Sequence, residues 1–270
     1  MKRSLSILAL LVLIGAIVDR SLPDQSGDLR GSAMGTGWHL RWRGDAPDRE
    51  ILRGEVAETL EKWEQVFSQW RDDSDLSRFN RGGKSTDELQ RVIELAQEIK
   101  SQSSGAFDPG LLQETGEAGF GPEGVGVDLS GIGKGYAVDR VAEALTEAGL
   151  EDFLFELGGE IIAVGGEWEV GIERPDPSGR SIARTVKLKN QALATSGNYR
   201  QFRPSAGGFA SHIIDPRTGK PVVRPPCSVS VIAGDCATAD AWATALFVLG
   251  KEISDPPGLK VQWNDFLTAK

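Results

Sequence analysis

The chain has 270 residues, a formal net charge of −9 and 40% hydrophobic residues, enough to bury the core of one large domain or of two closely joined lobes. The acidic balance argues against a nucleic-acid-binding protein, because the sequence has no basic stripe that could neutralise phosphates along a strand. The two cysteines, Cys227 and Cys236, lack the spacing of a zinc or redox motif and would be held apart by an extended strand, so we expect both in the core.

The first twenty residues predict an export segment. Lys2 and Arg3 precede an apolar run at residues 5–18, which is shorter than the roughly 20 residues of a comfortable membrane span. We expect a signal peptide or an uncleaved membrane anchor at residues 1–20, a linker at residues 21–31 and the folded domain at residues 32–270. No cysteine follows the apolar run, which excludes a lipid-modified N-terminal cysteine.

The folded part is expected to begin with a strand and a helix. Residues 38–42 alternate in the manner of a strand, and residues 48–68 place apolar side chains, Ile51 among them, at helical spacing. Residues 69–80 are polar and predict a turn, with a possible helix cap at Ser74.

A second amphipathic helix is expected at residues 88–101, capped by Thr86. Residues 104–109 predict a tight turn, whereas residues 110–126 are rich in glycine and show little hydrophobic periodicity. Beyond them, one helix is expected to end at Gly149, and a last one at residues 238–249 ends before Gly250. Strands are expected at residues 153–157, 160–164, 168–172, 185–188, 192–194 and 228–232.

A glycine-rich turn around Lys134 is the first candidate site. Asp128 is expected at the end of a short strand, followed by Gly131, Gly133 and Gly135 before the helix. Glycines let backbone N–H groups approach a ligand, and a helix start favours negative charge, so a phosphate or pyrophosphate fits this turn. A plain glycine-rich turn with a solvated lysine fits the same pattern.

Asp240 and Thr244 are spaced one helical turn apart and would share a helix face. A carboxylate and a hydroxyl suit a hard ion such as Mg²⁺. The alternative is an aspartate in the first turn of a helix and a threonine bonded to its own backbone. His212 is one of two histidines, and a lone histidine in a strand is either a base or an ordinary packing residue.

The order of eight short motifs resembles the ApbE family of exported or membrane-tethered FAD:protein FMN transferases. The motifs are MGT at Met34, WRDDSDLSRFN, SGAFDP at Ser104, DLSGIGKGYAVD at Asp128, LGGEI at Leu157, ATSGNY at Ala194, SHIIDPRTGKP at Ser211 and ATADAWATALFVLG at Ala237. The resemblance covers residues 32–250. It implies a mixed α+β fold that cleaves the FAD pyrophosphate with Mg²⁺, transfers FMN to a Ser or Thr of an acceptor protein and releases AMP.

The resemblance also implies roles for particular residues. The flavin-nucleotide contacts would be Met34, Trp70, Ala106, Phe107, Asp108, Asp128, Lys134 and Ile214. The Mg²⁺ ligands would be the Gly131 carbonyl, Asp240 and Thr244. His212 would remove the proton of the acceptor hydroxyl, and Lys134 would neutralise pyrophosphate charge together with the metal.

The resemblance implies an acceptor that carries a D-x-x-[ST]-G-A-[ST] type motif, as in membrane redox subunits, and an enzyme that works outside the cytoplasmic membrane. Residues 109–127 and the tail after Gly250 are shorter than the family's pattern, which indicates a trimmed lobe or an altered adenine side of the cleft. The same residues leave two other functions open, an FAD pyrophosphatase that releases FMN and AMP and a flavin-binding carrier.

Overall fold

The computed structural model describes residues 26–206 and 208–266, and its centre is a seven-stranded sheet in which every neighbouring pair is antiparallel. In spatial order the strands are β1 (Gly27–Ala33), β2 (Thr36–Trp42), β3 (Phe153–Leu157), β4 (Glu160–Val164), β7 (Gln191–Gly197), β11 (Cys227–Ala233) and β12 (Lys260–Asp265). Two-residue turns join β1 to β2 and β3 to β4, and the second of these is the pair Gly158-Gly159.

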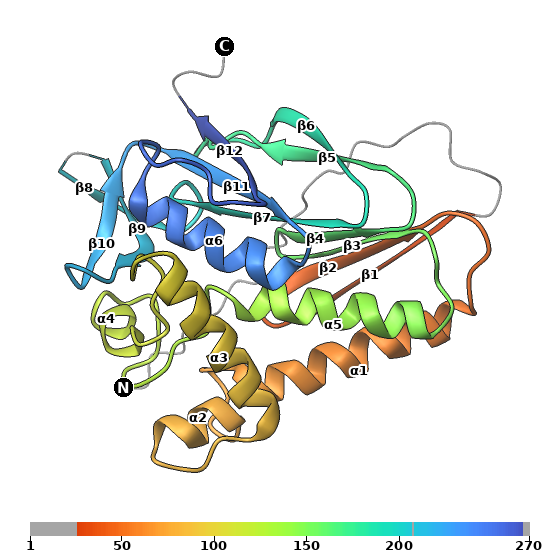
Figure 1. Ribbon diagram of the computed structural model, residues 1–270, viewed down its shortest axis with the longest axis horizontal. Helices are drawn as coiled ribbons and strands as arrows, with labels where there is room; N and C mark the ends of the chain where they lie inside the picture. The colour runs from red at the N-terminus through yellow and green to blue at the C-terminus, as the bar shows by residue number, and fades with distance from the viewer. Residues whose placement is uncertain (1–25, 207, 267–270) are drawn as a thin grey trace, which may run out of the picture.

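Helices cover one face of this sheet (Figure 1). The long ones are α1 (Arg49–Phe67), α3 (Asp87–Gln102), α5 (Gly133–Glu147) and α6 (Cys236–Leu249), and the short ones are α2 (Asp75–Asn80) and α4 (Leu112–Glu117). The α6 helix packs on β7 and β11, while α5 packs beside it on β3 and β4, and α1 covers the outer side of α5.

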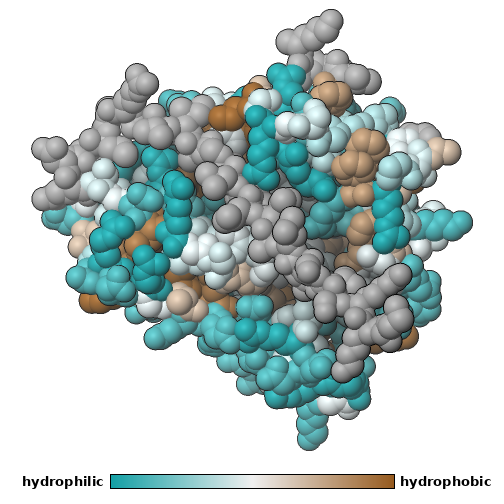
Figure 2. Space-filling model, turned by 180° about the vertical axis from the view of Figure 1, so that it is seen from behind, coloured by the Kyte–Doolittle hydropathy of each residue, from teal (hydrophilic) through white to brown (hydrophobic). Residues whose placement is uncertain are grey.

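The core continues through the sheet because side chains alternate between its faces. On β3, Phe153 and Phe155 join the cluster under the helices, whereas Leu154 packs with Ile161 and Trp168 on the other side. A two-stranded sheet, β5 (Trp168–Glu173) and β6 (Ile182–Leu188), covers that other side. The visible surface in Figure 2 is mainly hydrophilic with separate hydrophobic patches, as expected when the apolar faces are turned inward.

A small three-stranded sheet lies beside the end of α6 (Figure 1). Its order is β10 (Lys220–Arg224), β9 (Gly208–Asp215) and β8 (Phe202–Ser205). The central strand, β9, carries His212 and Ile214, so their positions follow from the contacts that α6 and α4 make with it.

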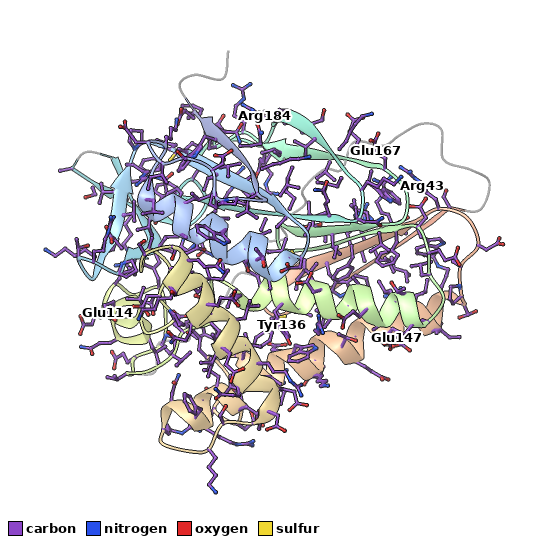
Figure 3. The ribbon with its side chains drawn as sticks, in the orientation of Figure 1. Arg43, Glu114, Tyr136, Glu147, Glu167 and Arg184 are labelled. Carbon is purple, nitrogen blue, oxygen red and sulfur yellow. The ribbon has the colours of Figure 1, made fainter. Side chains whose placement is uncertain are left out.

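Aromatic side chains fix the start of α5 against α1. Tyr136, labelled in Figure 3, has its ring centroid 4.9 Å from that of Trp63 in an edge-on contact, and Phe67 packs edge-on against the same ring. Because Tyr136 lies in the first turn of α5, these contacts hold the beginning of that helix in place.

The helices expected from hydrophobic spacing are confirmed, and so are the caps expected at Thr86 and Ser74. The Thr86 hydroxyl accepts a hydrogen bond from the backbone N–H of Leu89 at the start of α3, and the Ser74 hydroxyl accepts one from Ser77. Both cysteines are buried and free, as predicted. Ile51, expected on the buried side of α1, is 53% exposed instead, because the buried stripe runs through Leu52 and Val56.

Several local expectations were wrong. Residues 27–31, expected in a linker, form most of β1, because their backbone pairs with β2 along its whole length. Residues 75–80, expected as a turn, form α2 behind the Ser74 cap. Asp128 is not at a strand end: it lies in a loop where its own N–H donates to the Pro109 carbonyl and its carboxylate accepts the Ser130 N–H.

The expected export segment at residues 1–20 lies outside the described residues. Within residues 26–206 and 208–266, no helix combines the length and the hydropathy that crossing a membrane requires.

Candidate active site

The glycine-rich turn around Lys134 is the point where α5 meets α6. The α5 helix begins at Gly133, so Lys134 and Gly135 belong to its first turn and only Gly131 lies in the preceding loop. A Cβ at Gly135 would lie 2.3 Å from the Cys236 carbonyl oxygen and 2.8 Å from the Asp240 Cβ. Glycine at this position therefore lets the two helices touch through their backbones.

Asp240 faces this turn from α6. Its side chain is buried, and its Oδ2 accepts a hydrogen bond of 3.0 Å from the Gly135 N–H. Burial raises the pKa of Asp240, while the Lys134 charge and the Gly135 hydrogen bond oppose that shift. The carboxylate predicted from sequence is thus aimed at the start of α5, where Lys134 lies.

Lys134 is paired with Glu160, a residue that the sequence did not single out. The Lys134 Nζ lies 2.5 Å from Glu160 Oε1. Burial alone would lower the pKa of Lys134, but the charges of Glu160 and Asp240 raise it above its ordinary value, so the ammonium form is held. Burial raises the pKa of Glu160, against the opposing charge of Lys134, and Asp240 adds to the rise.

Glu160 also has an unsatisfied atom. Glu160 is 3% exposed, and its Oε2 is buried with no hydrogen-bond partner among the described residues. A buried carboxylate oxygen without a partner is costly unless something binds it. One signal was present in the sequence, because an acidic residue begins the otherwise apolar strand Glu160–Val164 within the LGGEI motif.

Gly131 and Thr244 lie side by side. A Cβ at Gly131 would be 3.2 Å from Thr244 Oγ1 and 3.1 Å from the Phe107 ring. The Thr244 hydroxyl lies 3.3 Å from the hydroxyl of Ser196 on β7. The structure therefore brings Gly131, Thr244 and Phe107 together, and Asp240 precedes Thr244 by one turn of α6.

The donors around this junction fit a hard divalent cation. The oxygen atoms that could bind it are the Asp240 carboxylate, the Thr244 hydroxyl and the Glu160 Oε2, which has no hydrogen-bond partner among the described residues. Among the described residues, no group of three or more His, Cys, Asp or Glu side chains could hold a metal. The ligands expected for Mg²⁺ include one side chain of these four types, that of Asp240. The other two are the Thr244 hydroxyl and the Gly131 carbonyl, so the expected site is not a cluster of that kind.

His212 reaches the site from the three-stranded sheet. Its Nδ1 lies 3.3 Å from the Gln201 carbonyl, and the Phe120 ring packs edge-on at 6.3 Å between centroids. Burial lowers the pKa of His212; the contact with Gln201 raises it and the nearby Lys134 charge lowers it further. The lowered pKa favours the neutral imidazole, the form that a proton acceptor requires.

The other predicted contacts have different local surroundings. Ala106 and Ile214 are buried. Asp108 forms an ion pair of 2.8 Å with Lys100, and the Asp128 carboxylate accepts a 3.0 Å hydrogen bond from Thr115 on α4.

Two predicted contacts lie in connecting segments. Met34 occupies the turn between β1 and β2, where its φ is 50°, and packs partly buried against the core. Trp70, between α1 and α2, is 69% exposed, so its ring is open to solvent.

Comparisons with known proteins show which family the chain resembles. The model of the ApbE family matches residues 34–125 and 112–255. A protein of Vibrio cholerae named FAD:protein FMN transferase is 31% identical, covering 85% of this chain and 83% of its own, and one of Escherichia coli K12 with the same name is 29% identical over 83% and 78%.

Solved structures show the same fold. The flavin transferase ApbE from Vibrio cholerae superposes with a TM-score of 0.75 at 28% identity, covering 90% of this chain and 98% of that one. The apo flavinyl transferase ApbE of Pseudomonas stutzeri gives 0.75 at 25% identity, over 90% and 96%. The family match spans most of the chain and contains every site residue described above, so this protein belongs to the ApbE family.

Proposed function

We propose that this protein is an FAD:protein FMN transferase. It would cleave the pyrophosphate of FAD, join FMN through a phosphoester to a Ser or Thr of an acceptor protein and release AMP. The observation that carries the proposal is the junction of α5 and α6, where Lys134, Asp240 and Glu160 meet at the start of a helix with a neutral His212 close by.

Each residue has a task that follows from its surroundings. Lys134, held in its charged form, neutralises the anionic oxygens of the pyrophosphate, and the positive end of the α5 helix dipole adds to that charge. His212 accepts the proton of the acceptor hydroxyl as its oxygen bonds to the FMN phosphorus. The bond from that phosphorus to the bridging oxygen breaks, and AMP leaves with the oxygen.

Mg²⁺ would be held by Asp240, Thr244 and the Gly131 carbonyl, and when bound it supplies positive charge to the pyrophosphate oxygens. The flavin nucleotide would be contacted by the residues around the centre, with the exposed Trp70 ring offering a stacking surface. Ala106 and Phe107, both buried beside the turn, would shape the wall of the site.

The direct test incubates the full chain with FAD, Mg²⁺ and an acceptor peptide that carries a D-x-x-[ST]-G-A-[ST] type motif. We expect the peptide to gain the mass of FMN in mass spectrometry and AMP to appear in equal amount. FMN and AMP released without peptide labelling would identify a pyrophosphatase instead, and FAD left intact with Mg²⁺ present would identify a carrier.

Matched variants separate the site residues from their neighbours. His212→Ala should lose most of the transfer rate, whereas His39→Ala should keep it, because His39 is bound near Asp28 at the far edge of the large sheet. Asp240→Ala should lose most of the transfer rate as well, whereas Asp235→Ala, at the exposed N-cap of the same helix, should keep it. Unchanged rates in His212→Ala and Asp240→Ala would refute the assignment.

We also propose export of the enzyme, with residues 1–20 as a signal peptide or anchor and membrane redox subunits as acceptors. The support is the charge and apolar pattern of those residues together with the family resemblance. Mass spectrometry of membrane proteins from cells with and without this chain identifies the acceptor. Cell fractionation locates the enzyme, and recovery of the intact chain in the cytoplasm would contradict export.

A further inference from the structure

We propose that Asp139 is a positioning residue that holds α6, and with it Asp240 and Thr244, in register with the start of α5. The two helices cap each other: a carboxylate from α6 binds an N–H of α5, and a carboxylate from α5 binds two N–H groups of α6. The consequence for catalysis rests on the proposed function, but the positioning itself does not.

The Asp139 carboxylate is engaged through both oxygens. Oδ1 accepts a 2.7 Å hydrogen bond from the Cys236 N–H, and Oδ2 accepts one of 2.9 Å from the Ala237 N–H. Asp139 is 8% exposed, so water competes little for these bonds. Hydrogen bonds between a carboxylate and backbone N–H groups are among the stronger ones in proteins.

Asp139 and Gly135 form one contact surface on α5. They are four residues apart and so lie on the same helix face. From that face Gly135 donates its N–H to Asp240, while Asp139 accepts from the residues that begin α6. The bonds run in opposite directions between the two helices, so a shift of either helix along the other would break bonds of both kinds.

Two different aspartates bind the N–H groups at the start of α6. The first two N–H groups of α6, those of Cys236 and Ala237, bind Asp139, whereas the third, that of Thr238, binds the side chain of Asp235. Asp235 belongs to the same chain segment as α6 and is exposed, so it caps the helix without attaching it to α5. Of these two aspartates, Asp139 both caps α6 and attaches it to α5, whereas Asp235 only caps it, so Asp235 is a matched control.

Hydrogen exchange tests the positioning without substrate or metal. Gly135 is the third residue of α5, where N–H groups have no partner within the helix, and its N–H donates to Asp240. In Asp139→Asn, one side-chain oxygen is replaced by an NH₂ group that cannot accept the second N–H, so α6 should shift. We expect exchange at Gly135, followed by mass spectrometry of the peptide at residues 131–138, to speed up roughly 10-fold or more.

Two comparisons decide the result. Asp235→Asn makes the same substitution at the other capping aspartate and should leave exchange at Gly135 unchanged, because an asparagine oxygen still accepts the Thr238 N–H. Asp139→Glu keeps the charge but displaces it by one methylene, so it should increase the exchange rate at Gly135 by an intermediate amount. It replaces Asp139→Asn in the test if Asp139→Asn does not fold. Exchange that is unchanged in both Asp139 variants, or that rises equally in Asp235→Asn, would overturn the proposal.

A second measurement connects the positioning to the reaction. The Mg²⁺ concentration for half-maximal FMN transfer should rise roughly 10- to 100-fold in Asp139→Asn, the range seen when residues behind metal ligands are changed, and should stay unchanged in Asp235→Asn. An absence of transfer in the unaltered protein would refute the proposed function alone, because the exchange experiment does not depend on it. Faster exchange with an unchanged Mg²⁺ requirement would overturn the catalytic part of the proposal.

Discussion

Gly135→Ala is the sharpest test of the helix junction, because the structure leaves no room for one added methyl group. The new Cβ would meet the Cys236 carbonyl oxygen at 2.3 Å and its carbon at 2.7 Å, both backbone atoms that cannot rotate away. Restoring ordinary contact requires the two helices to separate by about 1 Å. That separation would lengthen the 3.0 Å bond between the Gly135 N–H and Asp240.

The expected loss of stability is the balance of three effects. Alanine favours a helix over glycine by about 1 kcal/mol. Overpacking of a filled interior costs about 1–3 kcal/mol, and losing a buried hydrogen bond to a charged group costs about 1.5–3 kcal/mol. The net loss in the free energy of unfolding is therefore about 1.5–5 kcal/mol, and FMN transfer should fall with it because Asp240 moves.

Urea denaturation measures this loss, and Gly54→Ala is the matched control. Gly54 lies within α1 and no heavy atom lies within 4 Å of a Cβ placed there, so the same substitution should stabilise the protein by up to about 1 kcal/mol. If Gly135→Ala unfolds at the same urea concentration as the unaltered protein and keeps its transfer rate, the tight contact between α5 and α6 is refuted.

Three further predictions concern ionisable groups around the sheet. In urea denaturation, Glu160→Gln should lower the free energy of unfolding by about 1–3 kcal/mol, because Lys134 loses its buried partner while remaining partly hydrated. Glu167→Gln, in the exposed pair with Lys187, should cost less than about 1 kcal/mol. Burial raises the pKa of Glu156 to about 8, so the folded state favours the protonated carboxyl. Its contribution to stability is present at acidic pH and is lost as pH rises through 8. Glu156→Gln should remove this fall in the free energy of unfolding with pH. The lowered pKa of His212 should place the acidic limb of the transfer rate below pH 6.5.

Each of these changes has an outcome that would count against it. Equal losses in Glu160→Gln and Glu167→Gln would mean that the pair with Lys134 is as weak as a surface pair. A pH slope that persists in Glu156→Gln would assign the slope to another group. An acidic limb with a midpoint above pH 7 would show that His212 is not the base.

Hydrophobic spacing along the sequence predicted the helices that bury one continuous apolar stripe. The residues of α1 and α3 repeat apolar side chains every three or four positions, and the caps at Ser74 and Thr86 are hydroxyls that bond the backbone within three residues. Such contacts are near in sequence, so the sequence alone predicts them. The order of the short motifs likewise identified the family without any structure.

Strands at the edges of the large sheet, which form through backbone pairing and carry little apolar pattern, were missed. The strand β1 has one buried side chain, Leu29, and forms because its backbone pairs with β2; β12 likewise forms against β11. Neither has an apolar pattern of its own that reveals it. Strand formation at a sheet edge is decided by available backbone partners more than by residue type.

The sequence by itself determined the four long helices, the buried strands and the membership of the family, and it singled out Lys134 and Asp240 as candidate site residues. Only the tertiary structure decided that Glu160 pairs with Lys134, that Asp240 binds the start of α5 and that Asp139 binds the start of α6. These contacts join residues 26 to 105 positions apart, and their bond strengths depend on exclusion from water. Distance along the chain hides both the partner and the burial, and the two together set the chemistry of the site.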